Sequence, residues 1–333
     1  MSREDAGFCG SGGQAVIKTA VSEKAEITEA GAFVRQSNRF TTPFGGGDGE
    51  LPVEAGRYRL VVSPGCPWAH RQLIVFKLLG LEEAVSIGKV GPRTDKGWAF
   101  SLDPDGVDPV LGIRYLPEAY AKADPDYTGR ATVPAVVEIA TGKVVNNDYF
   151  RLSNYWETVW SPFHREGAPD LYPADLRGDI DALNDVLFHE VNNAVYKAGF
   201  AQSQAEYEKA YDLLFNRLDM LERRLGTQRY LFGDRLTDSD IRLWVTLARF
   251  DAGYYMAFKT NRDRLVDFPN LWNYAKDLYQ SPGFGETTDF ETIKRGYQLI
   301  SNAERNPYRI VSAGPDQSVW HDRHDRDRFS KSA

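Results

Sequence analysis

A strand that is followed by a Ser-Pro-Gly turn, and then by a Cys-Pro pair at the start of an apolar helix, is compatible with few folds. Apolar residues alternate along 58–62, which predicts a strand, and Ser-Pro-Gly at 63–65 ends it. Pro67 suits the first position of a helix. Residues 68–79 are apolar almost all round, so this helix is expected to be buried, with Gly80 as its C-terminal cap.

The segments that follow first alternate between strands and helices and then become helical only. A second strand is predicted at 84–90, followed by a long loop, a strand at 132–139 that contains a proline, and a short strand at 144–145. A helix is predicted to begin near 146–148. Further helices are predicted beyond residue 173, at 180–195, 205–225, 238–250 and 269–279.

These patterns predict two domains with a segment at each end. We expect an N-terminal extension at 1–50 that partly drapes over the fold, and an α/β domain at 51–160. An all-helical domain is expected at 170–300, and a charged, loose tail at 301–333. Thr237 and Asp240 have the spacing of a capping box at the start of one helix.

Composition excludes several classes of protein. The net charge is −7 at pH 7, which disfavours a nucleic-acid partner. The chain has neither an apolar run of membrane-spanning length nor a secretory signal, so we expect a cytoplasmic protein without a membrane partner. Its five His show no metal-ligand spacing and no phosphate-binding glycine loop occurs, so neither a metal site nor a permanently bound cofactor is expected.

Cys66 is the candidate nucleophile. Its position at a helix N-terminus is expected to stabilise a thiolate, and His70, one turn later, could help. A buried, inert cysteine is the alternative. The redox motif C-x-x-C has Ala69 in place of its second cysteine, so an external thiol must resolve a mixed disulfide on Cys66. Cys9 could resolve it in principle, but it lies in a glycine-rich segment.

Pro134 is the expected partner of Cys66 in a thioredoxin-like domain. In that fold a cis-proline faces the nucleophilic cysteine. The preceding residue, Val133, would then offer its backbone to an extended thiol peptide.

The chain resembles the glutathionyl-hydroquinone reductases, the Xi class of glutathione transferases, from about Gly31 to Pro315. The shared stretches are 56–58 (Gly-Arg-Tyr), 66–71 (Cys-Pro-Trp-Ala-His-Arg), 77–82, 97–98, 125–130, 132–134, 195–200, 241–244, 249–251, 277–280 and 306–307. The resemblance implies a thioredoxin-like domain followed by an all-helical glutathione-transferase domain, and a homodimer.

The resemblance also implies the reaction. Cys66 would attack the sulfur of a glutathionyl-hydroquinone, the hydroquinone would leave, and a second glutathione would release glutathione disulfide. Tyr196 and Tyr297 match family tyrosines that contact the aromatic ring, where phenol hydroxyls can donate hydrogen bonds. For each tyrosine the alternative is an ordinary core residue. The family has a His-Tyr-Tyr sequence where residues 295–298 read Arg-Gly-Tyr-Gln.

Residues that would hold the thiol cosubstrate follow from the same resemblance. Trp98, Arg130 and Val133 match family positions that bind it. The family's Glu-Ser pair, which grips the γ-glutamyl end, is replaced by Asp148 and Tyr149. The thiol cosubstrate is therefore glutathione, or mycothiol or another low-molecular-weight thiol.

Three other functions stay open. An omega-like thioltransferase or dehydroascorbate reductase would use the same single cysteine. A transferase that conjugates thiols to electrophiles normally uses Ser or Tyr where this chain has Cys66. A non-enzymatic scaffold on this fold would have little need of the cysteine.

Overall fold

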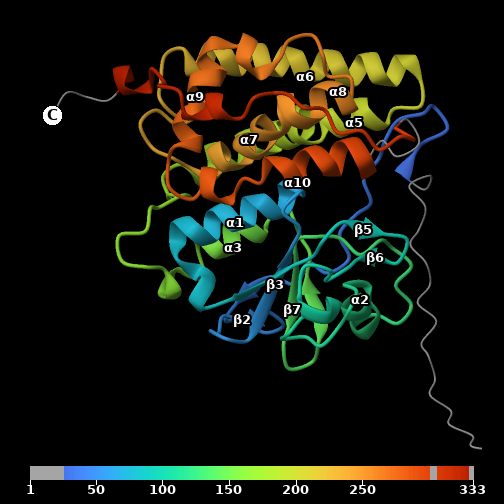
Figure 1. Ribbon diagram of the computed structural model, residues 1–333. Helices are drawn as coiled ribbons and strands as arrows, with labels where there is room; N and C mark the ends of the chain where they lie inside the picture. Colours follow the sequence, from blue (N-terminus) through green and yellow to red (C-terminus); the bar gives the residue numbers. More distant parts are fainter. Residues whose placement is uncertain (1–25, 301–305, 330–333) are drawn as a thin grey trace, which may run out of the picture.

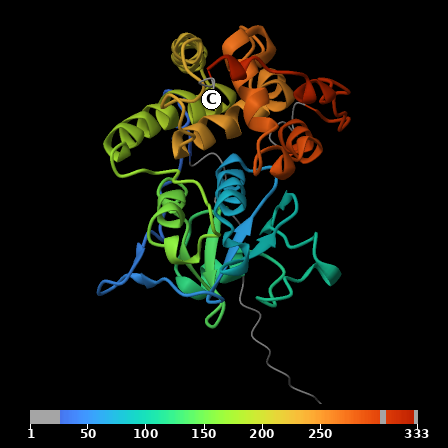
Figure 2. The same ribbon diagram turned by 90° about the vertical axis from the view of Figure 1, so that its left-hand side faces the viewer.

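The computed structural model describes residues 26–300 and 306–329. Figure 1 shows a small domain built around a sheet, with a larger domain of helices above it. Seen from the side, in Figure 2, the two domains form two layers that meet at helix α1 (Pro67–Leu79). The predicted combination of a thioredoxin-like domain and an all-helical domain is confirmed.

The sheet of the small domain has four strands in the order β4-β3-β7-β8. The central strand β3 runs parallel to β4, as expected when a helix connects them, and antiparallel to β7, which in turn pairs antiparallel with β8. The strands are β3 (Tyr58–Val62), β4 (Ser86–Lys89), β7 (Ala135–Glu138) and β8 (Lys143–Asn146). Two short ladders lie outside this sheet, formed by β1 (Phe44–Gly45) with β2 (Leu51–Pro52) and by β5 (Arg93–Thr94) with β6 (Gly97–Trp98).

The small domain holds one helix that the sequence analysis missed. Helix α2 (Pro117–Ala123) lies in the segment predicted as a long loop and packs against β8. It has only seven residues, too few to be stable by local propensity alone, and burial of Ala119 and Tyr120 supplies the missing stabilisation. The helix α3 (Leu152–Glu157) packs against α1.

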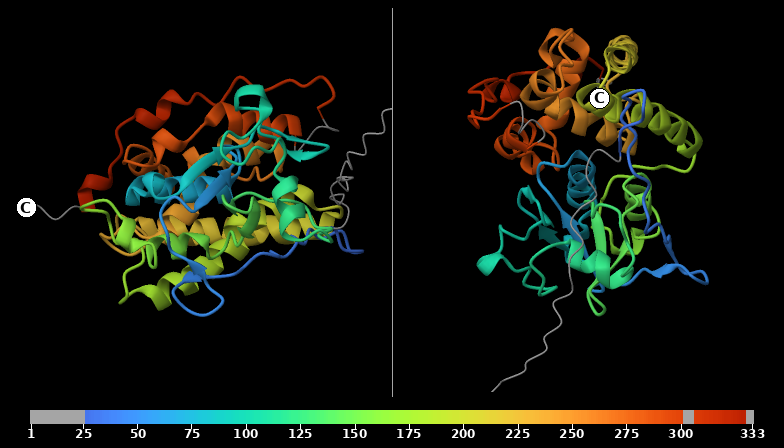
Figure 3. Two further views of the ribbon diagram at one scale, coloured as in Figure 1. Left: turned by 90° about the horizontal axis from the view of Figure 1, so that it is seen from below. Right: turned by 90° about the vertical axis from the view of Figure 1, so that its right-hand side faces the viewer.

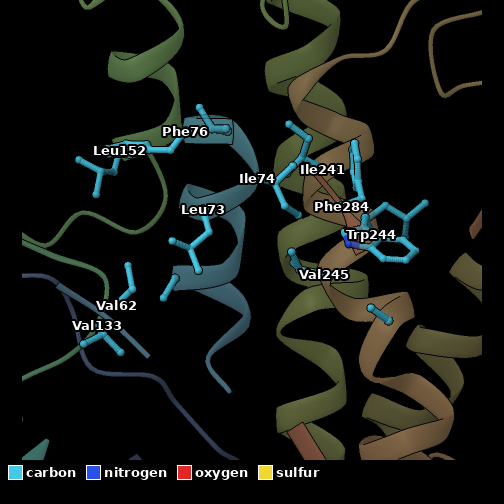
Figure 4. Close-up of a cluster of buried hydrophobic side chains, with 14 of the residues drawn as sticks. Val62, Leu73, Ile74, Phe76, Val133, Leu152, Ile241, Trp244, Val245 and Phe284 are labelled. Atoms are coloured by element: carbon cyan, nitrogen blue, oxygen red, sulfur yellow. The ribbon is translucent and has the colours of Figure 1, made fainter. Parts of the chain in front are cut away.

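Helix α1 is buried on every side, as its sequence predicts. All its residues except Lys77 are buried, and Gly80 caps it in the left-handed conformation with φ 74°. In Figure 4, Leu73 and Phe76 lie toward the sheet and α3, whereas Ile74 lies toward Val245 of helix α7 (Asp238–Arg249). Each such apolar side chain contributes about 1.5–3 kcal/mol on burial, so α1 fastens the two domains together.

The larger domain contains the helices predicted beyond residue 173, with interruptions. Short π-helical segments at 188–192, 250–254 and 296–300 follow directly on helices. The single helix predicted at 180–195 is therefore divided between α4 and α5. The helices are α4 (Arg177–Leu187), α5 (Ala194–Phe200), α6 (Gln204–Leu225), α7, α8 (Tyr255–Ala257), α9 (Pro269–Tyr279) and α10 (Phe290–Arg295).

Residues 26–50, here called the N-terminal strap, run across both domains. Figure 3 shows this blue segment beside the helices at one end and beside the sheet at the other. The ring of Phe33 lies 5.3 Å from that of Phe200 in the helical domain. Phe44 is buried in the small domain, with its ring 5.3 Å from that of Tyr58. Residues 1–25, including Cys9, lie outside the described residues.

The C-terminal segment is not loose over the part that is described. Trp320 is buried against Trp272, with ring centroids 4.7 Å apart. Arg326 is fully buried and donates to the carbonyls of Leu225 (2.8 Å) and Arg229 (3.0 Å). The charged composition predicted a solvated tail. One of these charges, the Arg326 guanidinium, is instead buried and donates to carbonyls at and just after the end of α6. None of the helices within 26–300 and 306–329 has the length and apolar character needed to cross a bilayer.

The predicted capping box at the start of α7 is confirmed, and it generates a prediction on stability. Asp240 accepts from the Thr237 N–H at 2.9 Å, and also from the Leu231 N–H (2.9 Å) and the Tyr274 hydroxyl (2.8 Å). Asp240→Ala leaves these buried donors without an acceptor, so we expect the free energy of unfolding to fall by about 3–5 kcal/mol. Thr237→Ala removes less, about 1 kcal/mol. Urea denaturation measures both, and an Asp240→Ala loss no larger than that of Thr237→Ala would contradict this account.

Candidate active site

Cys66 occupies the junction between β3 and α1, as N-cap residue of the helix. Its backbone is extended there (φ −81°, ψ 123°), and Pro67 fills the first helical position. The thiol is part-buried and donates to the carbonyl oxygen of Val133, with Sγ and O 3.5 Å apart. The Val133–Pro134 peptide is cis, so the expected pairing of a cis-proline with the cysteine is present.

The surroundings of Cys66 as a whole oppose the thiolate that the sequence predicts. Burial raises the pKa of Cys66 above its ordinary value. The backbone N–H groups of Ala69 and Trp68 and the guanidinium groups of Arg249 and Arg35 lower this pKa, but they do not outweigh the loss of water. The helix N-terminus therefore lowers the pKa of Cys66 as expected, but burial of the thiol raises this pKa by more. The sequence alone does not reveal that burial.

His70 does not assist the thiol. Its ring is buried, with Nε2 2.9 Å from Thr287 Oγ1 and Nδ1 3.0 Å from Arg249 Nη1. Burial and the neighbouring Arg249 lower the pKa of His70 well below its usual range, so the ring is neutral. The neutral His70 ring can orient the Arg249 guanidinium, but it adds no positive charge that would stabilise a thiolate.

Arg249, at the end of α7, is a site residue that the sequence analysis did not single out. It donates to the carbonyls of Gly65 (3.2 Å) and Pro64 (3.3 Å), in the turn that carries Cys66. The residue is fully buried, and within the described ranges no carboxylate forms an ion pair with it. A buried cation held only by neutral acceptors favours an anion nearby, and the thiolate of Cys66 is such an anion.

The site contains a triangle of three tyrosine hydroxyls. Tyr196 on α5 lies 2.7 Å from Tyr297 and 3.3 Å from Tyr254, oxygen to oxygen, and the last two are 3.1 Å apart. Burial raises the pKa of each, so all three stay protonated and can donate. Sequence reasoning had placed the first two here and missed Tyr254, because nothing distinguishes it from the other tyrosines of a chain that has 17.

Two π-helical segments supply two of the three tyrosines of this triangle. Tyr254 lies on 250–254 and Tyr297 on 296–300. A Cβ at Gly253 would lie 2.8 Å from a ring carbon of Tyr297, so the absence of a side chain at Gly253 lets the two segments approach. Such local widening of a helix is frequent at functional sites.

The comparisons with known proteins agree with this fold. The family description of the glutathione S-transferase C-terminal domain matches residues 204–277. The glutathionyl-hydroquinone reductase YqjG of Escherichia coli K12 is 41% identical over 276 residues, or 82% of this chain and 84% of the relative. Its glutathione-bound structure is 40% identical, with a TM-score of 0.78 over 87% of this chain and 95% of that one.

Two further solved structures give the same result. A glutathione transferase from Gordonia bronchialis is 52% identical, with a TM-score of 0.82 over 84% of this chain and 88% of that one. The Xi glutathione transferase of Phanerochaete chrysosporium is 41% identical, with a TM-score of 0.81 over 87% and 95%. The chain belongs to the glutathionyl-hydroquinone reductases, the Xi class of glutathione transferases. It is an enzyme.

In this Xi-class enzyme the residues at the family's γ-glutamyl position already have partners. Asp148 Oδ1 accepts from Asn38 Nδ2 (3.3 Å) on the strap and from the Phe150 N–H (3.1 Å). The ring of Tyr149 lies 5.1 Å from that of Trp68 and thereby adds to the aromatic wall of the site.

The other two residues matched to thiol binding differ in their surroundings. Arg130 forms a close ion pair with Glu26 of the strap, with a second contact from Nη2 to Oε1 at 3.2 Å. A thiol carboxylate would have to replace Glu26 to reach it. Trp98 is half-buried on β6, opposite Arg93. Within the described residues no group of three or more His, Cys, Asp or Glu is arranged to hold a metal ion.

Arg249 carries the prediction of this subsection. Arg249→Met should raise the pKa of Cys66 further, because it removes a nearby cation. Since burial already raises this pKa above its ordinary alkaline value, the thiolate fraction at pH 7.5 should fall several-fold. Arg249→Lys keeps the charge and should lose less.

The rate of iodoacetamide alkylation of Cys66 against pH measures this effect. Arg326→Met is the matched control, since it also removes a buried arginine but lies in the C-terminal segment. An alkylation profile for Arg249→Met that superposes on that of the unmodified enzyme would refute the electrostatic role.

Proposed function

We propose that this enzyme removes the thiol from thiol-conjugated hydroquinones through a mixed disulfide on Cys66, giving the hydroquinone and a disulfide. One observation carries the proposal. A single thiol, with Ala69 where a resolving cysteine would stand, shares its site with three protonated tyrosine hydroxyls. The proposal includes a homodimer, as the family resemblance suggests, and a cytoplasmic location, as expected from the sequence.

The first half-reaction transfers the thiol to Cys66. The ring takes a proton at its sulfur-bearing carbon from its own hydroxyl, while Tyr196 and Tyr297 donate hydrogen bonds to the ring oxygen. The Cys66 thiolate then attacks the sulfur, so an S–S bond forms and the C–S bond breaks. The electron pair of the C–S bond returns to the ring and leaves a phenolate, which takes up the proton that Cys66 lost.

The second half-reaction restores the enzyme. An external thiol attacks the mixed disulfide, Cys66 leaves as thiolate and regains a proton, and the symmetric disulfide departs. Ring carbon is reduced and the two thiol sulfurs are oxidised, so no bound cofactor is needed. Ala69 favours this route because it removes the internal competitor for the mixed disulfide.

The thiol cosubstrate is proposed to lie along the edge formed by Val133, Pro134 and Asp148, with Trp98 and Arg130 at its far end. The Asp148 Oδ2 oxygen accepts no hydrogen bond from residues 26–300 or 306–329, and is thus available to a cationic group. Glutathione fits this chemistry through its γ-glutamyl ammonium. Mycothiol or another low-molecular-weight thiol is the alternative, because Tyr149 stands where the family has a small hydroxyl.

The Cys66 cycle is tested with a glutathionyl-hydroquinone. The unmodified enzyme should release hydroquinone and, in single turnover without free thiol, carry one thiol adduct on Cys66 by mass spectrometry. Cys66→Ser should lower turnover by at least about 10³-fold, because the oxygen cannot form the disulfide. A variant that kept its turnover would rule out the mixed disulfide. Dehydroascorbate serves as the comparison substrate, and faster turnover with it would favour an omega-like thioltransferase.

The identity of the thiol is tested by restoring the family pair. The double variant Asp148→Glu, Tyr149→Ser should lower KM for glutathione about tenfold, if the longer acid and smaller hydroxyl recover one charge-assisted contact. Its KM for mycothiol should not fall. Saturation of the unmodified enzyme by low-millimolar glutathione, with no change in the double variant, would show that glutathione already fits.

A further inference from the structure

We propose that Arg35, on the N-terminal strap, binds the oxygen anion of the hydroquinone as it leaves Cys66. This inference rests on the function proposed above and names one further residue for that reaction. It is drawn from the position of the guanidinium group, its missing partner and the charge that the reaction creates.

Arg35 reaches the site from outside both domains. Its Nε donates to Asn193 Oδ1 at 3.0 Å, which fixes the group against the start of α5. The guanidinium carbon lies 4.8 Å from the ring centroid of Tyr196 and 5.2 Å from that of Trp68. The cation therefore lies against the faces of aromatic side chains, one of which belongs to a tyrosine of the triangle.

The outer end of this guanidinium lacks a protein partner. Nη2 is buried and makes no hydrogen bond, and within the described ranges no carboxylate pairs with Arg35. Its neighbours on the strap and in the site differ, since Arg39 pairs with Asp124 at 3.2 Å and Arg130 with Glu26. A buried donor without an acceptor costs about 1–3 kcal/mol, so an anionic ligand at this position would recover that energy.

The positive charge of Arg35 acts on both Cys66 and Tyr196. It lowers the pKa of Cys66 and that of Tyr196, although burial raises both overall. The guanidinium is thus close enough to act on both the sulfur that attacks and the hydroxyl that faces the ring.

The reaction needs a cation at this place. When the C–S bond breaks, its electron pair passes through the ring to a hydroxyl oxygen, which becomes a phenolate. The three tyrosines are neutral and can only donate hydrogen bonds to it. Arg249 is committed to the turn before Cys66 through Gly65, Pro64 and His70. Arg35 is a further cation, placed beside Tyr196, with Nη2 free to donate to the anion.

The test is the dependence of C–S cleavage on the acidity of the leaving hydroquinone. Single-turnover rates of hydroquinone release are measured for glutathionyl-hydroquinones with ring chlorine or methyl substituents. Arg35→Gln should slow cleavage about 10²–10³-fold for the methylated, least acidic leaving groups and much less for the polychlorinated ones. Arg35→Lys, which keeps the charge without the planar fork, should lie between Arg35→Gln and the unmodified enzyme.

Arg39→Gln is the matched control, an arginine of the same strap whose side chain is 65% exposed. It should leave the rates and their dependence on acidity unchanged. Thermal unfolding and alkylation of Cys66 report whether each variant is folded with an accessible thiol. If Arg35→Gln slows all substrates equally, or changes only KM, Arg35 merely anchors the strap and the inference is overturned. Absence of a Cys66 adduct in the unmodified enzyme would instead overturn the proposed function, and this inference with it.

Discussion

Helix α1 is packed on every side, and the position of the Cys66 thiol depends on that packing. Its sheet-facing residues complete the core of the small domain, and its opposite face completes that of the helical domain. A helix held so firmly keeps its first turn, and hence the sulfur, at a constant distance from the cis Val133–Pro134 peptide and from the tyrosines of the other domain. The same burial removes water from the thiol, so the packing that fixes the nucleophile also raises its pKa.

Two guanidinium groups offset part of that cost, and neither has a carboxylate partner among the described residues. Many arginines elsewhere in the molecule pair with a carboxylate, as Arg229 does with Asp277 at 2.8 Å. At the site, Arg249 is held by carbonyls and a neutral imidazole, and Arg35 by an amide and three rings. The two guanidinium groups can therefore stabilise the Cys66 thiolate and the hydroquinone anion that is released from the site.

Three parts of the chain form the active site: the N-terminal strap, the small domain and the helical domain. The strap supplies Arg35 near the tyrosines, Asn38 against Asp148 and Glu26 against Arg130, so it contacts both the ring side and the thiol side. The glycine-rich, polar sequence of the strap did not predict that it would contribute side chains to the site. Its aromatic side chains, Phe33 and Phe44, anchor it to one domain each.

Local pattern alone determined the alternation around β3, the apolar helix after Cys66, the Gly80 cap and the capping box at Thr237, because each depends on neighbouring residues. The place of Cys66 between a strand and a helix was enough to select it, and the family resemblance selected Tyr196 and Tyr297. Only the tertiary structure decided that the thiol is desolvated, that His70 is neutral, and that Tyr254, Arg249 and Arg35 join the site. Those properties arise from residues far apart in sequence, and burial and charge at a point depend on everything packed around it.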